Sequence, residues 1–217
     1  MSSAERELTT TSYAILGLLA VRPWSTYELA KQMRRNLHYF WPRAESNLYA
    51  EPKRLVEAGF AKARSEPVGQ RPRTVYSITP KGRRALGRWL GEPASDSRLE
   101  SETLVKLAFA DNGSKQDLLH TLQRYREVAE TRRQELRAIF HEYLRGDDPF
   151  PARVHINVVA YRLLWDTTEA EASWAAWAID QVERWSDDLN TRPDRQTALD
   201  VLDEALARAC RGEAGLG

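Results

Sequence analysis

The residues of this chain with the clearest chemical potential are cations, amides and tyrosines in its first 90 residues. Arg and Lys side chains bind phosphate oxygens, and Asn and Gln side chains can pair with the edges of nucleic-acid bases. These residue types therefore predict contacts to phosphates and base edges. The candidate contact residues are Tyr27, Lys31, Arg34, Arg35, Ser46, Asn47, Tyr49, Lys53, Arg54, Gln70, Arg71 and Arg73.

The charge of the chain is divided between two opposed halves. The 217 residues hold 32 Lys and Arg against 31 Asp and Glu, a net charge of +1. Residues 1–90 alone hold 16 against 7, a net charge of +9, and residues 91–217 hold 16 against 24, a net charge of −8. A basic surface gains affinity for DNA by releasing counterions from the phosphates. We therefore expect the first half to bind double-stranded DNA and the second half to stay off it.

Catalytic, metal and cofactor chemistry has little support in this sequence. No G-x-S-x-G, Walker or G-x-G-x-x-G pattern occurs, and the four histidines lack metal-ligand spacing. Asp147 and Asp148 precede a proline, where a turn is the simpler interpretation. We expect no enzyme activity, no metal and no cofactor.

The compartment is indicated by what surrounds the longest apolar run. Residues 14–21 are eight apolar or glycine residues, far fewer than the roughly 20 that span a bilayer. The run follows Glu5 and Glu7 rather than a basic stretch, so a signal peptide is not expected. The single cysteine, Cys210, excludes an intramolecular disulfide. These features predict a cytoplasmic protein that makes no membrane contact.

The elements that must position the contact residues follow from capping signals and periodicity. Ser25 and Glu28 fit a capping box, Gly59 is a helix stop, and Thr79-Pro80 begins a helix. Ser12 is a candidate cap for the first helix. Helices are predicted at residues 12–21, 26–35, 45–58 and 80–90, and strands at residues 60–66 and 73–79. This order predicts a winged helix-turn-helix with a two-stranded wing.

The helix at residues 45–58 is the predicted recognition helix. Ser46, Asn47 and Tyr49 would face the major groove at its start. Pro52 is unusual inside a helix because it removes a hydrogen bond, so the helix is either kinked there or begins later. Tyr49 has a second interpretation, as a half-buried aromatic between helices.

Phosphate contacts are predicted from the second half of this helix and from the wing. Lys53 and Arg54 lie nearly two turns beyond the base-reading residues. Gln70, Arg71 and Arg73 lie near the tip of the hairpin, where arginines suit phosphates or the adjacent minor groove. A solvated hairpin is the alternative interpretation.

The first 90 residues resemble the PadR family of bacterial transcriptional regulators. The resemblance is carried by Tyr27-Glu28-Leu29 with Lys31, by Asn47-Leu48-Tyr49 with residues 54–60, and by residues 73–83. The family usually has a proline directly after its Leu-Tyr pair, whereas here the proline is at position 52. The resemblance implies a DNA-binding regulator, and repression is the expected output.

The second half is predicted to be entirely helical, which makes the whole fold mainly α. Residues 91–99 are a predicted linker, residues 100–189 a helical domain and residues 190–217 a helical tail. The order of one short and two long helices is similar to the larger PadR subclass, whose C-terminal domain resembles that of a group of virulence activators. The resemblance implies a homodimer whose C-terminal helices clasp the partner.

Aromatic side chains favour a dimer on physical grounds as well. Four of the seven tryptophans lie in one predicted helix, and aromatic surface beyond the needs of a core suits an interface. Two-fold symmetry would place the recognition helices about 34 Å apart, on a pseudo-palindromic operator. An intrachain bundle is the alternative. The candidate interface residues are Leu118, Leu122, Tyr125, Trp165, Trp174, Trp177 and Trp185.

The same helix is a candidate for ligand binding. Trp165, Trp174 and Trp177 would line a pocket for a small aromatic effector, which the resemblance permits, whereas core packing is the alternative. The predicted function is a sequence-specific DNA-binding regulator, with a winged-helix adaptor that binds only proteins as the alternative.

Overall fold

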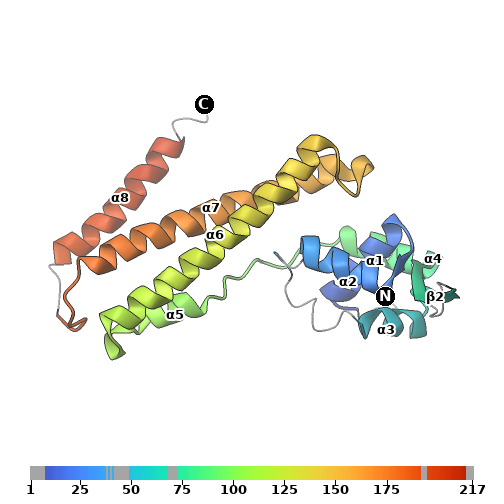
Figure 1. The fold of residues 1–217 in the computed structure, drawn as a ribbon, viewed down its shortest axis with the longest axis horizontal. Helices are drawn as coiled ribbons and strands as arrows, with labels where there is room; N and C mark the ends of the chain where they lie inside the picture. The colour runs from blue at the N-terminus through green and yellow to red at the C-terminus, as the bar shows by residue number, and fades with distance from the viewer. Residues whose placement is uncertain are drawn as a thin grey trace. The chain divides into compact units, whose positions relative to one another are not determined.

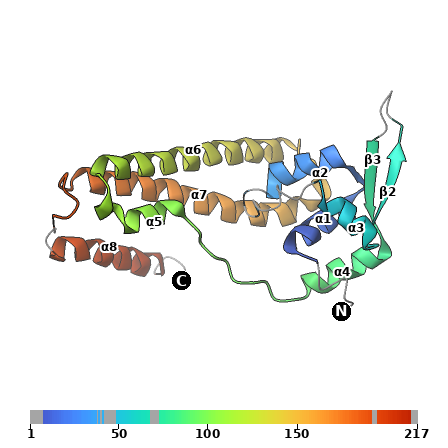
Figure 2. The same cartoon turned by 90° about the horizontal axis from the view of Figure 1, so that it is seen from below.

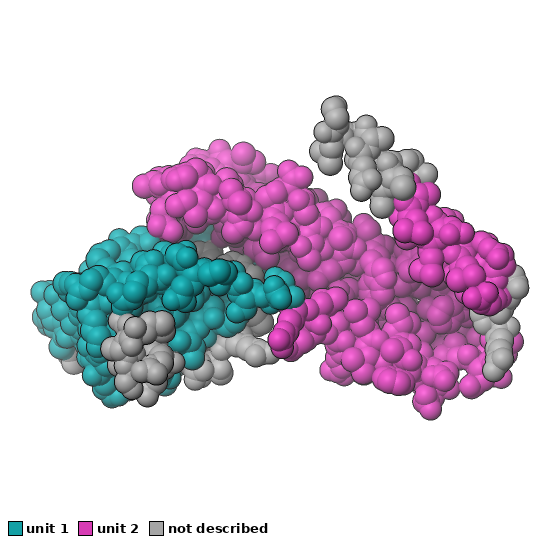
Figure 3. Space-filling view, turned by 180° about the vertical axis from the view of Figure 1, so that it is seen from behind, with its two compact units in different colours: residues 1–97 teal, residues 98–217 magenta. Residues whose placement is uncertain are grey.

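The computed structural model describes residues 8–37, 39, 41, 49–67, 73–191 and 195–213. It divides the chain into two compact units, Met1–Ser97 (unit 1) and Arg98–Gly217 (unit 2), which Figure 3 colours separately. Among the described residues, none of the helices combines the length and the apolar character that a membrane crossing requires.

Unit 1 consists of helices around a small antiparallel sheet (Figure 1). Its described elements are α1 (Thr10–Val21), β1 (Trp24–Ser25), α2 (Thr26–Gln32), the π-helical turn η1 (Met33–Leu37), α3 (Glu51–Glu57), β2 (Ala61–Glu66), β3 (Arg73–Ile78) and α4 (Pro80–Leu90). The strand order is β1-β3-β2, and Figure 2 shows β2 and β3 as a hairpin that stands out from the helices. The predicted winged helix-turn-helix is confirmed.

Local hydrogen bonds explain where these helices begin and end. The Ser25 hydroxyl accepts from the Glu28 N–H at 3.3 Å, and the Glu28 carboxylate accepts from the Ser25 N–H at 2.8 Å, which completes the predicted capping box. The Thr79 hydroxyl accepts from the Gly82 N–H at 3.1 Å and caps α4. Gly59, directly after α3, has a φ of 75° that favours glycine.

Three details of unit 1 differ from the sequence predictions. The cap of α1 is Thr9, and Ser12 is instead the third helical residue, which completes a capping box with Thr9. α2 ends at Gln32 and passes into a π-helical turn rather than continuing to residue 35. The sheet has a third strand, β1, which at two residues is too short to show an alternating pattern.

The core of unit 1 joins all of its elements. The Trp24 indole N–H donates to the Leu18 carbonyl at 2.7 Å, and the Arg22 guanidinium lies 3.5 Å above the Trp24 ring. Tyr13 stacks on Trp89 with ring centres 4.6 Å apart and so connects α1 to α4. Other fully buried residues are Ile15, Leu16, Leu19, Leu29, Met33, Leu55 and Phe60.

Unit 2 is built on a long antiparallel helical hairpin. Its α-helices in the described part of the chain are α5 (Glu102–Ala108), α6 (Lys115–Arg145), α7 (Val154–Glu183) and α8 (Arg195–Glu213), with 3-10 turns at Ala110–Asn112 and Pro151–Arg153. Buried residues recur every seven positions along α6 and α7, as in a coiled coil. They include Leu122, Ala129 and Leu136 on α6, and Tyr161, Thr168, Ala175 and Val182 on α7.

The interruption of the apolar pattern at Arg132 and Arg133 is an ion-pair layer in this hairpin. Arg132 Nη1 lies 2.7 Å from Glu171 Oε2, and Arg133 Nη1 lies 3.4 Å from Glu169 Oε1. Neighbouring Glu130 also hydrogen-bonds Arg133 and is the main reason that the pKa of Arg133 is raised. The two cross-helix pairs fix the register of α6 against α7.

Replacing Thr168 with valine is expected to stabilise the hairpin. Thr168 is buried in the seam, and its hydroxyl oxygen has no hydrogen-bond partner among the described residues. Removing an unsatisfied buried hydroxyl while keeping its shape is favourable by about 1 kcal/mol. The urea midpoint of the full chain should therefore rise. The neighbouring Thr167→Val is the control, because the exposed Thr167 hydroxyl donates to the Leu163 carbonyl at 2.8 Å; an equal rise for both variants would contradict the argument.

Candidate nucleic-acid interface

A buried carboxylate fixes the first turn of α3. Glu51 is buried, its Oε1 accepts from the Ser12 hydroxyl, and its Oε2 lies 3.4 Å from Arg54 Nη1. The Ser12 oxygen in turn accepts from the Thr9 N–H at 2.9 Å. A chain of hydrogen bonds therefore joins the N-terminal cap of α1 to the start of α3, and it sets where α3 begins.

The predicted recognition helix is shorter than expected. Tyr49 and Ala50 form a turn, so a continuous helix over residues 45–58 is wrong, and α3 begins at Glu51. Pro52 lies in the first turn, where its missing N–H has no helical partner to lose. The later start was one of the two alternatives that Pro52 raised. Ser46 and Asn47 lie outside the described residues.

Two tyrosines are unusually exposed beside α2 and α3. Tyr27, the second residue of α2, is 73% exposed, and Tyr49, two residues before α3, is 60% exposed. The interpretation of Tyr49 as a half-buried aromatic between helices is therefore wrong. An exposed phenol can donate to a phosphate or contact a base. The cations Lys31 of α2, Arg34 of η1, and Lys53 and Arg54 of α3 are exposed, and Arg35 of η1 is half-buried.

Hydrogen bonds keep the start of α2 in place. Burial raises the pKa of Glu28, but hydrogen bonds from the Ser25 side chain and backbone and from Arg22 outweigh it, so the net pKa lies below its ordinary value. Arg22 Nη2 lies 3.2 Å from Glu28 Oε1. Glu28 is therefore ionised at neutral pH, and the capping box holds the turn that presents Tyr27.

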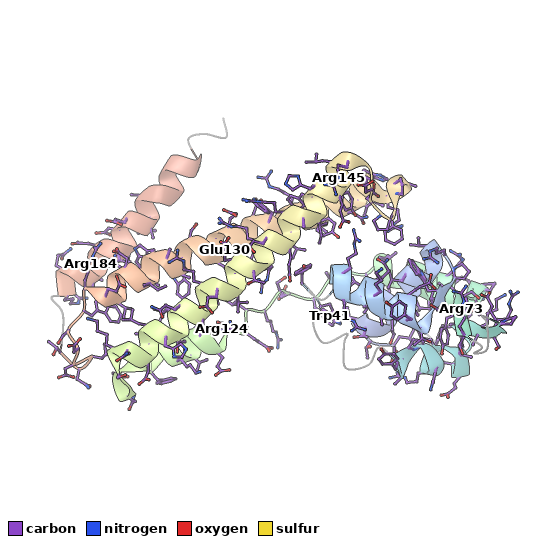
Figure 4. All side chains as sticks on the ribbon, in the orientation of Figure 1. Trp41, Arg73, Arg124, Glu130, Arg145 and Arg184 are labelled. Carbon is purple, nitrogen blue, oxygen red and sulfur yellow. The ribbon has the colours of Figure 1, made fainter. Side chains whose placement is uncertain are left out.

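The wing carries cations on one face of its two strands. Arg73, labelled in Figure 4, lies opposite Glu66 in the register of β2 and β3, and its Nη2 is 3.1 Å from Glu66 Oε2. Arg64 Nη2 lies 3.2 Å from the other oxygen of Glu66, so one carboxylate serves two arginines. Lys62 lies on this face as well, two residues before Arg64. Sequence reasoning missed Lys62 and Arg64, although their alternation along β2 was a usable signal.

Only one of the three residues predicted near the wing tip lies in the described part of the chain. Gln70 and Arg71 lie outside the described residues, whereas Arg73 is exposed at the beginning of β3. The structure therefore places the base of the wing and its cations.

The wing is fixed to α3 by a close backbone contact. The Phe60 carbonyl accepts from the Thr79 N–H at 3.0 Å. The Thr79 hydroxyl lies 2.8 Å from the Gly59 carbonyl oxygen and 3.0 Å from the Phe60 carbonyl oxygen, so its single proton is shared between them. Lys81 Nζ donates to the Ala58 carbonyl at 2.8 Å and lies 4.3 Å from the centre of the Phe60 ring. Gly82 allows α4 to approach this turn, since a Cβ at that position would lie 2.2 Å from the Phe60 oxygen. Close contacts therefore hold the end of α3, the base of the wing and the start of α4 together.

Metal chemistry has no candidate centre in the described part of the chain. No group of three or more His, Cys, Asp or Glu side chains there is arranged to hold a metal ion.

The residues predicted for a dimer interface divide into buried, half-buried and exposed sets, and the half-buried ones are Tyr125, Trp165 and Trp174. Leu118 and Leu122 are buried within unit 2 against Ile179 and Val182, so the prediction that they face a partner is wrong. Their heptad spacing serves the hairpin itself. Trp177 and Trp185 are exposed on or just after α7 and stay candidates for an interface.

The structure does not bring the candidate effector residues together. Trp165 packs on Phe140 with ring centres 5.3 Å apart, and Trp174 meets Tyr125 edge-on at 5.4 Å. Twelve residues of α7 separate Trp165 from Trp177, which is about 18 Å along a helix. The two described cavities, of about 820 and 830 Å³, are lined by none of these three tryptophans.

Two family models match the chain, one in each unit. Residues 15–88 match the Transcriptional regulator PadR-like family, and residues 100–183 match the family Virulence activator alpha C-term. The negative transcriptional regulator PadR of Bacillus subtilis is 24% identical over 172 residues, which are 76% of this chain and 91% of the relative.

Solved structures share the same fold. Bacillus subtilis PadR in complex with operator DNA superposes with a TM-score of 0.67 at 20% identity and covers 80% of this chain and 99% of its own. The complex of Bacillus subtilis PadR with p-coumaric acid has a TM-score of 0.63 at 21% identity, covering 81% of this chain and 100% of its own.

Proposed function

Because this chain belongs to the PadR-like family of transcriptional regulators, we propose that unit 1 binds operator DNA and that the chain acts as a homodimeric repressor. The observation that carries the proposal is the cationic surface of α2, α3 and the wing in a half of the chain with a net charge of +9. The exposed Tyr27 and Tyr49 lie on the same elements. The relative solved with operator DNA supports this assignment.

In the proposed complex the elements of unit 1 have separate tasks. The segment up to Tyr49 and the first turn of α3 enter the major groove, where Asn47 and Tyr49 contact base edges. The DNA phosphates are bound by Lys31, Arg34, Arg35, Lys53, Arg54, Arg71 and Arg73, together with Gln70 at the wing tip. Two copies read the two halves of a pseudo-palindromic site about 34 Å apart.

Regulation by a small aromatic ligand is part of the proposal. The support is a relative solved with p-coumaric acid. A ligand can shift the operator affinity only if it binds one arrangement of the dimer better than another. p-Coumaric acid is the first compound to test in an operator-binding titration. We propose no catalytic activity, and we place the protein in the cytoplasm, where its operator lies.

Selection of duplexes from a random pool at a stated salt concentration tests the proposed function. An enriched inverted repeat is the expected result, because a two-fold dimer reads two equal half-sites. Recovery of unrelated sequences, or of no duplex, would favour the protein-binding adaptor.

Lys53→Ala is expected to weaken binding of all duplexes about equally. The side chain is exposed on α3, and each phosphate contact contributes about one unit to the slope of log affinity against log salt. The slope should therefore fall by about one, measured by fluorescence anisotropy from about 50 to 200 mM salt. Lys106→Ala in α5 removes the same charge from unit 2 and should leave the slope unchanged. Equal slopes for the two variants would place Lys53 away from DNA.

A further inference from the structure

α8 carries an apolar stripe that the described chain does not cover. The match to the second family model ends at residue 183, and α8 lies beyond it at Arg195–Glu213. Leu199, Leu202 and Leu206 follow one another at intervals of three and four residues, so they share one face of the helix. Leu202 and Leu206 are 58% and 66% exposed. Since most helical stability in proteins comes from packing of an apolar face, α8 needs another surface.

The first half of α7 carries a stripe with the same spacing. Ile156, Val159 and Leu163 repeat the intervals of three and four residues and are 49%, 71% and 69% exposed. They face away from the seam with α6, which Tyr161 and Thr168 occupy. Two apolar stripes of equal length and heptad spacing are the components of a two-helix contact.

We infer that α8 of one copy packs on the first half of α7 of a second copy. Leu199, Leu202 and Leu206 lie against the stripe of Ile156, Val159 and Leu163, and the reciprocal contact completes a two-fold pair. This inference rests on the homodimer of the proposed function and assigns the tail a role as a clasp between copies.

The chain between α7 and α8 is too short for α8 to reach the α7 stripe of its own copy. The segment after α7 is tied to the end of the hairpin where α6 begins: Lys115 Nζ donates to the Trp185 carbonyl at 2.7 Å, and Asn190 Nδ2 donates to the Asp111 carbonyl at 3.4 Å. Even with a fully extended chain between Thr191 and the start of α8, Leu199 lies at most about 20 Å from Thr191. Leu163 lies 20 residues before the end of α7, about 30 Å along the helix.

Symmetry and charge favour a second copy as the occupant. A two-fold axis across the middle of the hairpin brings the α8 end of one copy to the α7-start end of the other, so the contact forms twice and each stripe is covered once. Residues 153–166 contain two arginines and one carboxylate, Asp166, which pairs with Arg162, whereas residues 199–207 contain three carboxylates and no Lys or Arg. The two segments therefore attract each other.

Disulfide trapping in the full chain tests the clasp. The background is Cys210→Ser, into which Val159→Cys and Leu202→Cys are introduced together, and the protein is oxidised under mild conditions. The expected product is a covalent dimer on a non-reducing gel, with the peptides of residues 159 and 202 linked. The matched control replaces Glu204 instead of Leu202, because residue 204 points away from the stripe. An intrachain link, or equal dimer yields for both pairs, overturns the inference.

Sedimentation separates a failure of the clasp from a failure of the proposed function. Leu202→Asp should weaken the dimer by about tenfold or more, and Glu204→Asp, which keeps the charge and lies away from the stripe, should leave it unchanged. A dimer that is unaffected by Leu202→Asp, forms no specific link and still selects an inverted repeat overturns the clasp alone. A chain that is monomeric and selects no DNA overturns both.

Discussion

Replacing Gly82 with alanine is expected to unfold unit 1 under conditions in which the parent chain is folded. The added Cβ would lie 2.2 Å from the Phe60 carbonyl oxygen and 2.9 Å from Cγ1 of Ile78. That oxygen accepts from the Thr79 N–H at 3.0 Å, so it cannot move away without weakening the hydrogen bond that joins the two turns. Over-packing of this kind costs about 3 kcal/mol, a large share of the stability of a domain.

A second glycine of the same helix provides the control. A Cβ at Gly87 would have no heavy atom within 4 Å, so Gly87→Ala should stabilise α4 by about 0.5–1 kcal/mol. Urea unfolding followed by circular dichroism measures both variants, and operator binding measures the consequence for the wing. Two variants with effects of the same sign would contradict the close contact between α4 and the Phe60 turn.

Helix boundaries in unit 1 that depend on local chemistry follow from the sequence. The capping box of Ser25 and Glu28, the cap at Thr79 and the stop at Gly59 are each satisfied within four residues. A short sequence pattern therefore contains all the partners of the interaction. This is the reason that α4 begins where the sequence predicted.

Boundaries that depend on distant partners do not follow. Glu51 begins α3 and bonds Ser12, which is 39 residues away, and no local pattern announces that pair. β1 is defined by its pairing with β3, about 50 residues later in the chain, through the register of Trp24 with Tyr76. A two-residue strand carries no periodicity that would reveal it.

The need to know distant contacts also explains why the prediction from net charge succeeded and the prediction of Leu118 and Leu122 as interface residues did not. A heptad pattern does not say whether its partner helix belongs to the same chain, and α7 occupies the seam in which Leu118 and Leu122 were expected to meet a second copy. The charge of +9 in residues 1–90 needs no knowledge of contacts. Composition alone therefore predicts which half binds DNA, whereas the residues that we propose to join two copies could be chosen only from the exposure of side chains and the length of the helices.

Replacing Glu51 with alanine is expected to weaken operator binding although it removes a negative charge from the DNA-binding half. Ser12 is fully buried, and its hydroxyl would lose the carboxylate and keep the weaker contact with the Thr9 hydroxyl, 3.1 Å away. A hydrogen bond to a charged group contributes about 1.5–3 kcal/mol. The start of α3 would then be free to shift, and with it Tyr49 and the segment that we propose to contact the bases. We expect operator affinity to fall about tenfold or more, since a shift at the reading surface disturbs several contacts at once.

Glu57→Ala is the matched control for this prediction because it removes the same charge from the same helix. Glu57 is exposed near the end of α3. Electrostatics alone makes both variants bind DNA slightly more tightly, since each raises the positive charge of unit 1 by one. The two positions differ in their contacts, so operator affinity should fall for Glu51→Ala and stay level or rise for Glu57→Ala. Anisotropy titrations on one selected operator at one salt concentration decide it, and equal gains in affinity for both would show that the bond between Ser12 and Glu51 does not position α3.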